Sequence, residues 1–477
     1  MKNKALYILI VGGMVLHGCK TPQATVQGDS VKSALPIHYQ GDSAQSSKPS
    51  IVPWKQFFTD PHLVTLIETA LANNQDLRIT LQQIAMAQSD VLYRSGRLLP
   101  TVIAGAGLGV NKPGRYTSEG AGNATTDIKP GKVMPDPLMD YNLGVQASWD
   151  ANLWNKLGAE KRAAVEHYLA TVEGRNDVFS SLISMVVGDY YRLLALDNKL
   201  DIVHTYIELQ RRAVEIAKIQ KSADADTELA VQKFEAELAK ASSDEYTVKQ
   251  EIIETENALN LLLGRYPESI TRDKTMFFTS DLQRLSLGVP AQLLDNRPDI
   301  RQAEHELAAT KWNVEAARKE FFPSLNISAA IGLDAFNPTY LTKLPQSLAF
   351  SVVGGLTTPL INRTAIQANF KSADAQQIEA LYQYDKTLLT AYAEVCNLIS
   401  KIDNLGKYFD LKKKESQTLD KSVEVARELY LNGRANYLDV LLDQRDALDA
   451  RLELLEARQQ QLSTMVEIYR SLGGGWQ

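Results

Sequence analysis

Acidic residues are the side chains whose spacing in this chain most suggests a functional chemistry. Asp439 and Asp443 stand four residues apart, so a helix would place both carboxylates on one face. They follow the break "LNGRAN" (431–436), where Gly433 suits the left-handed position that ends a helix. Repeated around an opening, such carboxylates would favour cations and repel anions. The alternative is a solvated helix face that also carries Arg445.

Bond-making chemistry finds no support in the sequence. The six histidines are scattered, and no pair has the spacing of metal ligands. The glycine run "GAGLG" (105–109) lies in a strand pattern with no helix after it, which argues against a nucleotide site. Neither a GxSxG elbow nor a phosphate-binding GxxxxGK is present. The sequence therefore predicts no enzyme, no metal site and no cofactor.

Composition narrows the partners and the possible organisation. The chain has 477 residues, 44% of them hydrophobic, and a formal net charge of −6. Nucleic-acid binding favours basic stripes, so this mild acidity predicts no nucleic-acid partner. The length allows two or three ordinary domains or one large elongated unit.

The N-terminus predicts export and a lipid anchor. Its apolar run is too short to span a bilayer, so residues 1–18 are expected to be a signal peptide. Leu16 to Cys19 resembles the bacterial lipobox, in which the cysteine is lipidated, palmitate included, and starts the mature chain. An ordinary cleaved signal is the alternative. Lys20 after the cysteine favours the outer membrane, and residues 19–59 are expected to form a tether. No other run is apolar enough for a transmembrane helix.

The mature chain contains two copies of one unit. When residue 73 is set against residue 296, "NNQDLRITLQQ" falls on "NRPDIRQAEHE", and the match continues without a gap as far as residues 111 and 334. A repeat of this length decides the fold. We therefore expect a first repeat over residues 60–263, a bridge over 264–298 and a second repeat over 299–477.

Each copy predicts the same order of elements. An amphipathic helix (74–97, 299–321) precedes a pair of strands, and a long helix (152–222, 362–431) precedes a return helix that ends near Leu263 or Tyr469. The strands are expected at 101–111, 140–150, 323–334 and 347–358. They alternate apolar residues with glycine or small polar residues, a pattern typical of transmembrane strands. An ordinary half-buried strand is the alternative. The predicted fold class is mainly α with β.

The stretch "GVPAQLLDNRPDIRQAE" (288–304) predicts a tight corner within the bridge. Pro290 suits the first turn of a short helix, and Arg297 precedes a proline and is biased away from the helical region. Asn296 is then expected to cap a new helix with Pro298 and Asp299 in its first turn.

Four strands in one chain predict an oligomer. The smallest transmembrane barrels have about eight strands, and an open sheet edge is not tolerated in lipid. Two chains would supply eight strands and three chains would supply twelve.

These features together resemble one known family. The corner motif, the twin strand–helix units, the lipobox and "YLNGRANYLDVLLDQRDAL" (430–448) are similar to the TolC-type outer-membrane efflux family, in its OprM/NodT lipoprotein branch. Asn296 stands where that branch usually has a basic residue. The resemblance implies a homotrimer with a 12-stranded β-barrel in outer-membrane lipid, standing on a periplasmic α-helical barrel. Its partners would be a periplasmic membrane-fusion adaptor and an inner-membrane RND (resistance-nodulation-division) transporter.

The resemblance also implies roles for particular residues. Asp439 matches a gate position, whereas Asp443 is offset from the usual second acidic residue. Gly433 matches a position where the adaptor docks, and Ala223 is its expected counterpart in the first repeat. Further tip residues are expected to hold the aperture shut, through a link from Tyr437 or Arg434 to an aspartate of the other tip. These further tip residues are Asp224, Asp226, Tyr430, Arg434 and Tyr437.

Three functions compete at this point. The leading hypothesis is the exit duct of a tripartite efflux system that carries small molecules. The second is a duct for type I protein secretion, driven by an ABC transporter. The third is a lipid-anchored coiled-coil tether without a pore, which would have continuous heptads and no strands. The strand patterns contradict the third hypothesis, and the sequence does not name a cargo.

Overall fold

The computed structural model describes residues 22–25, 52–224, 227–279, 293–358 and 363–476. The predicted signal peptide, Cys19, Asp226 and the first part of the corner stretch lie outside the described residues. The chain forms two compact units. The first contains residues 86–168 and 305–381 together with the N-terminal segment, and the second contains 30–85, 169–304 and 382–477. Each unit therefore draws on both sequence repeats.

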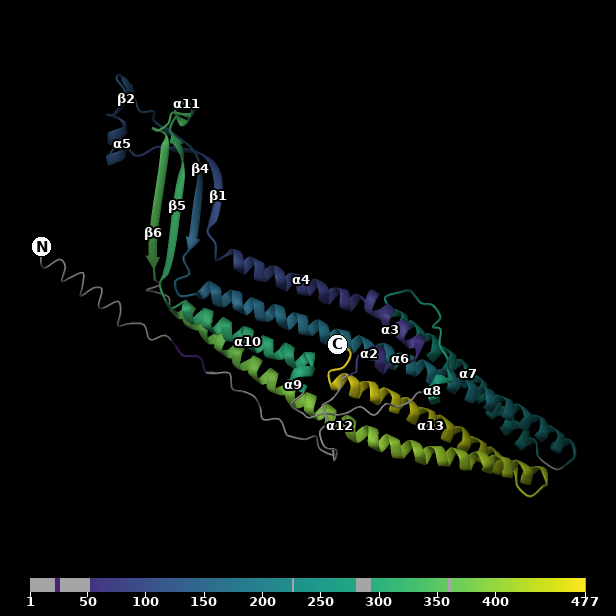
Figure 1. Ribbon diagram of the computed structural model, residues 1–477. Helices are drawn as coiled ribbons and strands as arrows, with labels where there is room; N and C mark the ends of the chain where they lie inside the picture. The colour runs from purple at the N-terminus through teal and green to yellow at the C-terminus, as the bar shows by residue number, and fades with distance from the viewer. Residues whose placement is uncertain (1–21, 26–51, 225–226, 280–292, 359–362, 477) are drawn as a thin grey trace. The chain divides into compact units, whose positions relative to one another are not determined.

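The first unit contains a four-stranded antiparallel sheet (Figure 1). Its strands are β1 (Thr101–Asn111), β4 (Leu138–Asp150), β5 (Ser324–Ala335) and β6 (Leu348–Thr357), in the spatial order β1-β4-β5-β6. The two hairpins, one from each repeat, meet where β4 pairs with β5. Because β1 and β6 each have one partner strand among the described residues, the sheet ends in two edges.

The two faces of this sheet differ in chemistry. On one face Leu108 lies opposite Tyr141, and Ile331 lies opposite Phe350. This face is apolar and exposed, with Phe350 at 77%. Small and polar side chains dominate the other face, because side chains alternate along a strand, and Ile103 and Val353 are its large apolar members. Its members include Gly105, Gly107, Asn142, Gly144, Gln146, Ser328, Ala330, Gly332 and Ser351.

Two tryptophans bind the turns that connect helices α4 (Gln75–Gly96) and α10 (Pro298–Lys319) to the sheet. The indole of Trp149 donates a hydrogen bond to the carbonyl of Leu98 over 3.0 Å. The indole of Trp154 donates to the carbonyl of Pro323 over 2.7 Å, and its ring stacks on Phe322 at 5.0 Å. Aromatic residues with one polar atom suit this position at the end of an apolar sheet.

Four helices have one part in each unit. They are α4 (Gln75–Gly96), α6 (Lys156–Ser222), α10 (Pro298–Lys319) and α12 (Arg363–Leu431). The prediction that the first long helix begins at Asn152 is wrong. Asn152 and Asn155 both have positive φ, 46° and 59°, so the helical conformation begins at Lys156.

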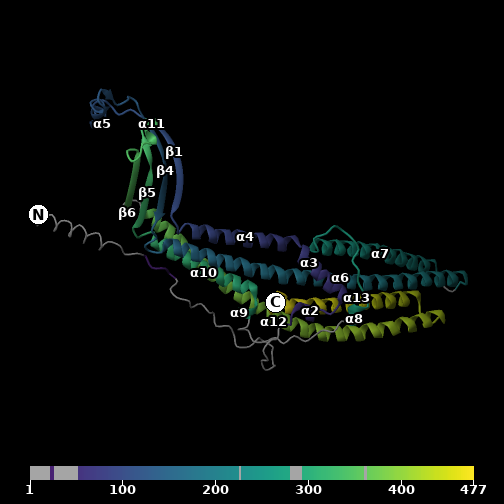
Figure 2. The same cartoon turned by 45° about the horizontal axis from the view of Figure 1, so that its top comes forward.

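The second unit is built from two helical hairpins (Figures 1 and 2). Helix α6 returns through α7 (Glu228–Leu262), and α12 returns through α13 (Tyr437–Ser471), each return helix having 35 residues. Shorter helices complete the unit: α2 (Trp54–Phe57), α3 (Pro61–Asn73), α8 (Met276–Thr279) and α9 (Leu293–Asn296). The loops of the first unit hold α5 (Ser118–Asn123), β2 (Asp127–Lys129), β3 (Lys132–Val133) and α11 (Pro338–Leu341).

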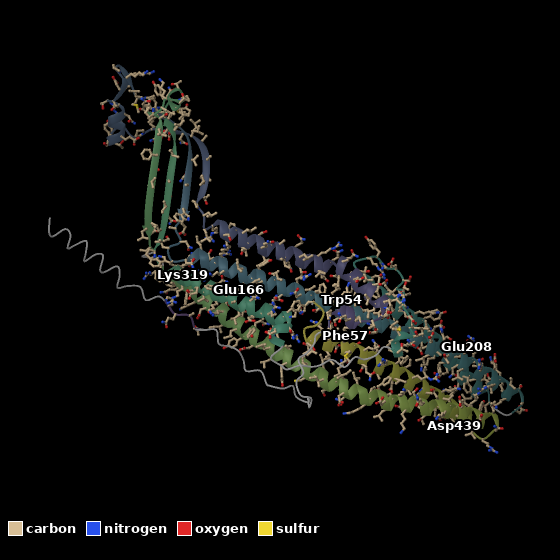
Figure 3. The ribbon with its side chains drawn as sticks, in the orientation of Figure 1. Trp54, Phe57, Glu166, Glu208, Lys319 and Asp439 are labelled. Atoms are coloured by element: carbon tan, nitrogen blue, oxygen red, sulfur yellow. The ribbon has the colours of Figure 1, made fainter. Side chains whose placement is uncertain are left out.

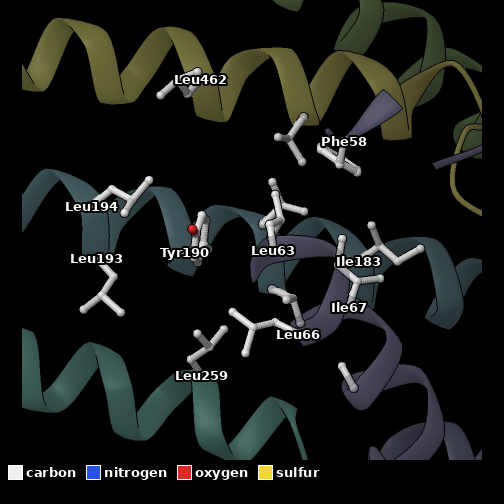
Figure 4. Packing of buried hydrophobic residues seen from close by; sticks show 14 of the residues in the cluster. Phe58, Leu63, Leu66, Ile67, Ile183, Tyr190, Leu193, Leu194, Leu259 and Leu462 are labelled. Carbon is white, nitrogen blue, oxygen red and sulfur yellow. The ribbon is translucent and has the colours of Figure 1, made fainter. Parts of the chain in front are cut away.

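The hydrophobic core of the second unit gathers around α3 (Figure 4). Leu63 and Ile67 of α3 are fully buried beside Leu259 of α7. Tyr190 of α6 is also fully buried, and its hydroxyl donates to the carboxylate of Asp60 over 2.6 Å. That carboxylate also accepts from the backbone of His62 and so caps α3.

Where α4 begins, the end of α7 meets it through one asparagine. The side chain of Asn74 accepts from the backbone of Leu77 (3.0 Å), and its amide nitrogen donates to the carbonyl of Leu262 (3.0 Å). Gly264 has φ +65°, and a Cβ there would overlap the carbonyl of Asn73. We call these four residues, Asn73, Asn74, Leu262 and Gly264, the first joint.

The second repeat has a corresponding joint where α13 ends and α10 begins. Arg297 is buried, and its guanidinium binds Asp299 through two hydrogen bonds of 3.0 and 2.8 Å. It also donates to Glu394 (2.7 Å) and to the carbonyl of Ser471 (3.1 Å). We call Asn296, Arg297, Ser471 and Gly473 the second joint.

The second joint corrects the predicted cap. Asn296 ends α9, and Arg297 directly precedes α10, with its carbonyl accepting from the backbone of Arg301. The Asn296 carbonyl instead accepts from the indole of Trp476 over 3.1 Å. Arg297 lies outside the helices before its proline, as predicted, and it takes the position directly before α10 that was expected for Asn296.

Candidate functional site

The second tip, residues 431–436, ends α12 with a Schellman motif. The backbone N–H of Gly433 donates to the carbonyl of Tyr430, and that of Arg434 donates to the carbonyl of Leu429. Gly433 has φ +67°, as predicted for a helix-terminating glycine, and nothing lies within 4 Å of the position of a Cβ. The turn is therefore held by its own backbone, and its outer surface is open.

A capping box begins α13 directly after this turn. The side chain of Asn436 accepts from the backbone of Leu438 and Asp439, and the carboxylate of Asp439 accepts from the backbone of Asn436 over 3.1 Å. Asp439 is exposed and lies at the far end of the α12–α13 hairpin (Figure 3). Negative charge is favourable in the first turn of a helix, so Asp439 stabilises this end of α13.

Asp443 has a different environment one turn further along α13. Its side chain is partly buried, and it accepts a hydrogen bond from the hydroxyl of Ser422 in α12 over 2.9 Å. The two aspartates therefore lie one turn apart on α13 as predicted, but Asp443 contacts the neighbouring helix whereas Asp439 is exposed. Arg445 is exposed on the same helix.

The first tip, residues 223–227, follows α6. Its backbone shows that the predicted counterpart of Gly433 is wrong by one residue. Asp224 has φ 55°, the left-handed conformation, and it stands two residues after the end of α6, as Gly433 does after α12. Thr227 caps α7 three residues later, as Asn436 caps α13. The counterpart is therefore Asp224, and Ala223 precedes it. Aspartate tolerates this conformation better than most residues with a Cβ, which the sequence comparison between the repeats overlooked.

Apolar contacts connect the two tips. Tyr430 is buried with Ala426 and Val440, and Ile216 of α6 packs against this cluster. The ring of Tyr437 meets that of Phe234 in α7 at 6.4 Å, edge to face. The predicted ion or hydrogen-bond link from Tyr437 or Arg434 to Asp224 is not formed within this chain, and Asp226 lies outside the described residues.

A polar layer joins the two hairpins further from the tips. Gln210 of α6 is fully buried, and its amide donates to Gln444 of α13 over 3.0 Å. Beside it runs a groove of about 470 Å³ between α6, α12 and α13. Arg451 and Asp420 form an ion pair of 2.7 Å in its lining.

Histidines in the first unit pair with glutamates and form no metal centre. His305 Nδ1 lies 2.8 Å from Glu166, and His167 Nδ1 lies 2.9 Å from Glu306. The hydrogen bond that the imidazole donates to the Glu306 carboxylate raises the pKa of His167, and burial opposes this shift. Across the described part of the chain, no group of three or more such side chains could hold a metal ion.

One described helix, α6, is long and apolar enough over part of its length to cross a membrane by composition. Half of that stretch is buried inside the structure, and α6 supplies Tyr190, Leu193 and Leu194 to the core of the second unit. A core helix has this composition too, so the finding is weak evidence for a transmembrane helix.

Comparison with known proteins decides the family. The sequence profile of the family described as "Outer membrane efflux protein" matches residues 66–265 and 289–474. The solvent efflux pump outer membrane protein SrpC of Pseudomonas putida is 30% identical over 491 residues, covering 100% of this chain and 99% of that protein. The chain belongs to the outer membrane efflux protein family.

Other members of the outer membrane efflux protein family agree in length and fold. The cation efflux system protein CusC of Escherichia coli O6:H1 is 25% identical, covering 97% of each chain. The solved structure of the outer-membrane channel OprN has a TM-score of 0.80 at 24% identity, covering 96% of this chain and 98% of that one. The predicted family and fold class, mainly helical with strands and built of tandem repeats, are confirmed.

Sequence reasoning missed several residues that hold the efflux fold together. Asn74, Gly264, Gly473 and Trp476 were not singled out. A signal was present, because "LLLGRY" (261–266) and "RSLGGG" (470–475) share a leucine and a glycine when residue 261 is set against residue 470. The alignment that starts from residues 73 and 296 stops at residues 111 and 334, early in each repeat, because the two copies differ in loop length further along.

Proposed function

We propose that this chain is the exit duct of a tripartite efflux system in the outer membrane. It would carry small molecules from an inner-membrane RND transporter and a periplasmic membrane-fusion adaptor across the outer membrane. The observation that carries this proposal is the sheet of the first unit. Its exposed apolar face suits lipid, its small and polar face suits a water-filled passage, and its edges need partners.

The edges of the sheet support a homotrimer. An unpaired strand edge is costly in lipid because its backbone groups lack hydrogen-bond partners. Three chains would close β1 of one protomer on β6 of the next and give a barrel of about twelve strands. Native mass spectrometry of the detergent-extracted protein measures this directly. Three chains per particle would support the proposal, and two chains would replace it with an eight-stranded barrel.

Cys19 is proposed as the lipid anchor. Acyl chains on one cysteine add membrane affinity to that of the barrel. The mass of the mature N-terminal peptide should include acyl chains, and the Cys19→Ala variant should lack them. An N-terminal peptide that carries no acyl mass in the wild-type protein would leave only an ordinary signal peptide.

Asp439 and Asp443 are proposed to line the periplasmic gate. Three chains would bring up to six carboxylates to the second tips, where they attract cations. The Asp439→Asn/Asp443→Asn double variant keeps acceptors for Asn436 and Ser422 and removes only the charge. It should lower the cation preference of single-channel currents. Asp403→Asn, which changes an exposed aspartate elsewhere on α12, is the matched control. An unchanged ion preference would place the aspartates outside the gate.

The open surface at Gly433 is proposed as an adaptor contact, with Tyr430, Arg434 and Tyr437 beside it and Ala223, Asp224 and Asp226 on the first tip. Gly433→Trp should abolish adaptor pull-down and leave the trimer intact. Gly433→Asn is the control, because asparagine adopts the left-handed conformation at little cost and adds a small side chain. Equal pull-down by the tryptophan variant would remove Gly433 from the interface.

In-cell cross-linking of the intact protein identifies the pump. Recovery of a proton-driven RND transporter would support small-molecule efflux. Recovery of an ABC transporter would assign the chain to type I secretion. SrpC is named for solvents and CusC for cations, although both are similar to this chain over nearly its full length. We therefore assign cargo choice to the inner-membrane pump, and no reaction or cofactor to this chain.

A further inference from the structure

Two loops, residues 112–137 and 336–347, lie at the end of the sheet opposite Trp149 and Trp154. They carry cations that lack carboxylate partners. Lys129, Lys132, Arg115 and Lys343 are exposed, and each lacks an ion pair among the described residues. Lys112 does lie near a carboxylate, 3.9 Å from Asp136. On the helices, by contrast, exposed lysines such as Lys407 are commonly paired. These four unpaired side chains are called the loop cations below.

An aromatic ring brings two of the loop cations together. The ammonium of Lys129, in the loop of the first repeat, lies 6.0 Å from the ring centroid of Tyr340. The ammonium of Lys343 lies 5.1 Å from the same centroid, and Phe336 packs edge to face on it at 5.5 Å. A cation–π contact holds an ammonium in place without neutralising its charge. The cluster therefore keeps its positive charge while joining loops from both repeats.

The remaining charges of the two loops reinforce this sign. Residues 112–137 and 336–347 contain five basic and three acidic side chains. Of the acidic ones, Asp136 faces Lys112, and Asp127 accepts a backbone hydrogen bond from Gly131 over 2.9 Å. The loop region is thus positive, although the whole chain has a net charge of −6.

The position of the cluster relative to the strands suggests what faces it. Tyr340 and Lys343 follow the end of β5 at Ala335 by five and eight residues, and α11 lies beside the ends of β5 and β6 (Figure 1). Trp149 and Trp154 lie at the opposite end of the sheet, which adjoins the helices. If that end is periplasmic, as the proposed function requires, the loop cations lie just beyond the outer edge of the hydrocarbon layer.

We propose that the loop cations form a docking surface for the phosphate groups of the glycolipid in the outer leaflet of the outer membrane. Lysine ammoniums bind phosphate as point charges, and a tyrosine beside them suits the boundary between acyl chains and headgroups. Each basic side chain near an anionic membrane surface adds to the attraction. The surface would hold the outer end of the barrel at a set depth and order the loops around its mouth. This inference rests on the proposed orientation in the outer membrane.

The test compares glycolipid binding by the wild-type trimer and by the Lys129→Gln/Lys343→Gln variant. Purified trimers in detergent are titrated with bisphosphorylated lipid A and with the same lipid after removal of both phosphates. The variant should bind bisphosphorylated lipid A at least about tenfold more weakly. Lys240→Gln/Lys407→Gln, which changes two exposed lysines on the helical hairpins, should bind like the wild type. Equal binding of the dephosphorylated lipid, or by the first variant, would overturn the proposal.

Two further measurements separate other ligands from the lipid. Inorganic phosphate at millimolar concentration should not displace lipid A, since acyl chains hold it beside the ring; displacement would overturn the assignment to a lipid. Single-channel ion preference should be the same in the wild type and in Lys129→Gln/Lys343→Gln. A changed ion preference would place the lysines in the passage and overturn the docking surface. If the purified wild-type protein is not a trimer, that result contradicts the proposed function and not the docking surface.

Discussion

At the first joint an uncharged amide, that of Asn74, reaches the carbonyl of Leu262. At the equivalent place in the second repeat, the guanidinium of Arg297 reaches the carbonyl of Ser471 and also binds two carboxylates. In both joints a glycine with positive φ lies against the carbonyl of an asparagine. The backbone geometry was thus kept while the side-chain chemistry diverged. One joint now depends on capping and the other on a buried charge.

Arg297→Met should produce the largest effect on this comparison. It leaves Asp299 and Glu394 without their cation beside a buried backbone carbonyl, at a cost of about 3–5 kcal/mol in the free energy of unfolding. Denaturant unfolding of the detergent-solubilised protein measures it. Adding Glu394→Gln to the variant should recover part of the loss. If the double variant is no more stable than Arg297→Met, unpaired charge is not the source of the cost.

Gly264→Ala should have the next largest effect. A left-handed residue with a Cβ costs about 1–2 kcal/mol, and overlap with the carbonyl of Asn73 adds to it. Gly473→Ala meets the same overlap with the Asn296 carbonyl, but that carbonyl also accepts the hydrogen bond from the indole of Trp476, which the overlap should release. The destabilisation caused by Gly473→Ala should therefore appear as greater protease sensitivity of the segment around Trp476. If Gly264→Ala and Gly473→Ala lower the thermal unfolding temperature equally, and Gly473→Ala is not more sensitive to protease, this distinction between the joints is wrong.

Asn74→Ala should cost about 1 kcal/mol, because it removes the side-chain cap of α4 and the bond to Leu262. Asn73→Ala is the matched control, since the side chain of Asn73 makes an exposed contact with Arg78. The shift in thermal unfolding temperature should be clearly smaller for the control. A control that is equally destabilised would mean that the asparagine cap contributes little.

The smallest expected effect is a pH dependence confined to the second joint. Burial raises the pKa of Asp177, which lies near Arg470, Asp299, Arg297 and Glu394; the arginines oppose the shift and the carboxylates add to it. Ionised Asp177 is therefore disfavoured in the folded state, so its contribution to stability falls as pH rises through its folded pKa. Asp177→Asn removes this penalty.

Thermal unfolding at several pH values measures this dependence. Relative to the wild type, Asp177→Asn should become more stable as pH rises from about 4 to about 7. Asn74→Ala should shift the unfolding temperature equally throughout that range, since it removes no charge. A constant difference for Asp177→Asn would show that the carboxylate has no shifted pKa.

The joints also show how far sequence could lead. Strand and helix patterns predicted the elements of both repeats, because periodicity of two or about 3.6 is local information. The left-handed turn at Gly433 was equally predictable from glycine after a helical pattern. The role of Asp224 was hidden because its conformation depends on the turn rather than on its residue type. For Arg297 the sequence predicts only a non-helical backbone before proline, since its partners Glu394 and Ser471 are distant in the sequence.

The equal lengths of the two return helices have a further consequence. Helices α7 and α13 align without a gap when residue 228 is set against residue 437, an offset of 437 − 228 = 209. Helices α4 and α10 also align without a gap, but with an offset of 298 − 75 = 223. The loop at 112–137 is longer than the loop at 336–347, and this excess accounts for the whole difference between the two offsets. Most of the difference in length between the two repeats therefore lies in these loops, while the paired strands and long helices differ by one to three residues. We therefore expect the return helices to keep equal lengths, so that the two tips can contact the same partner. The loops at 112–137 and 336–347 are free to vary in length.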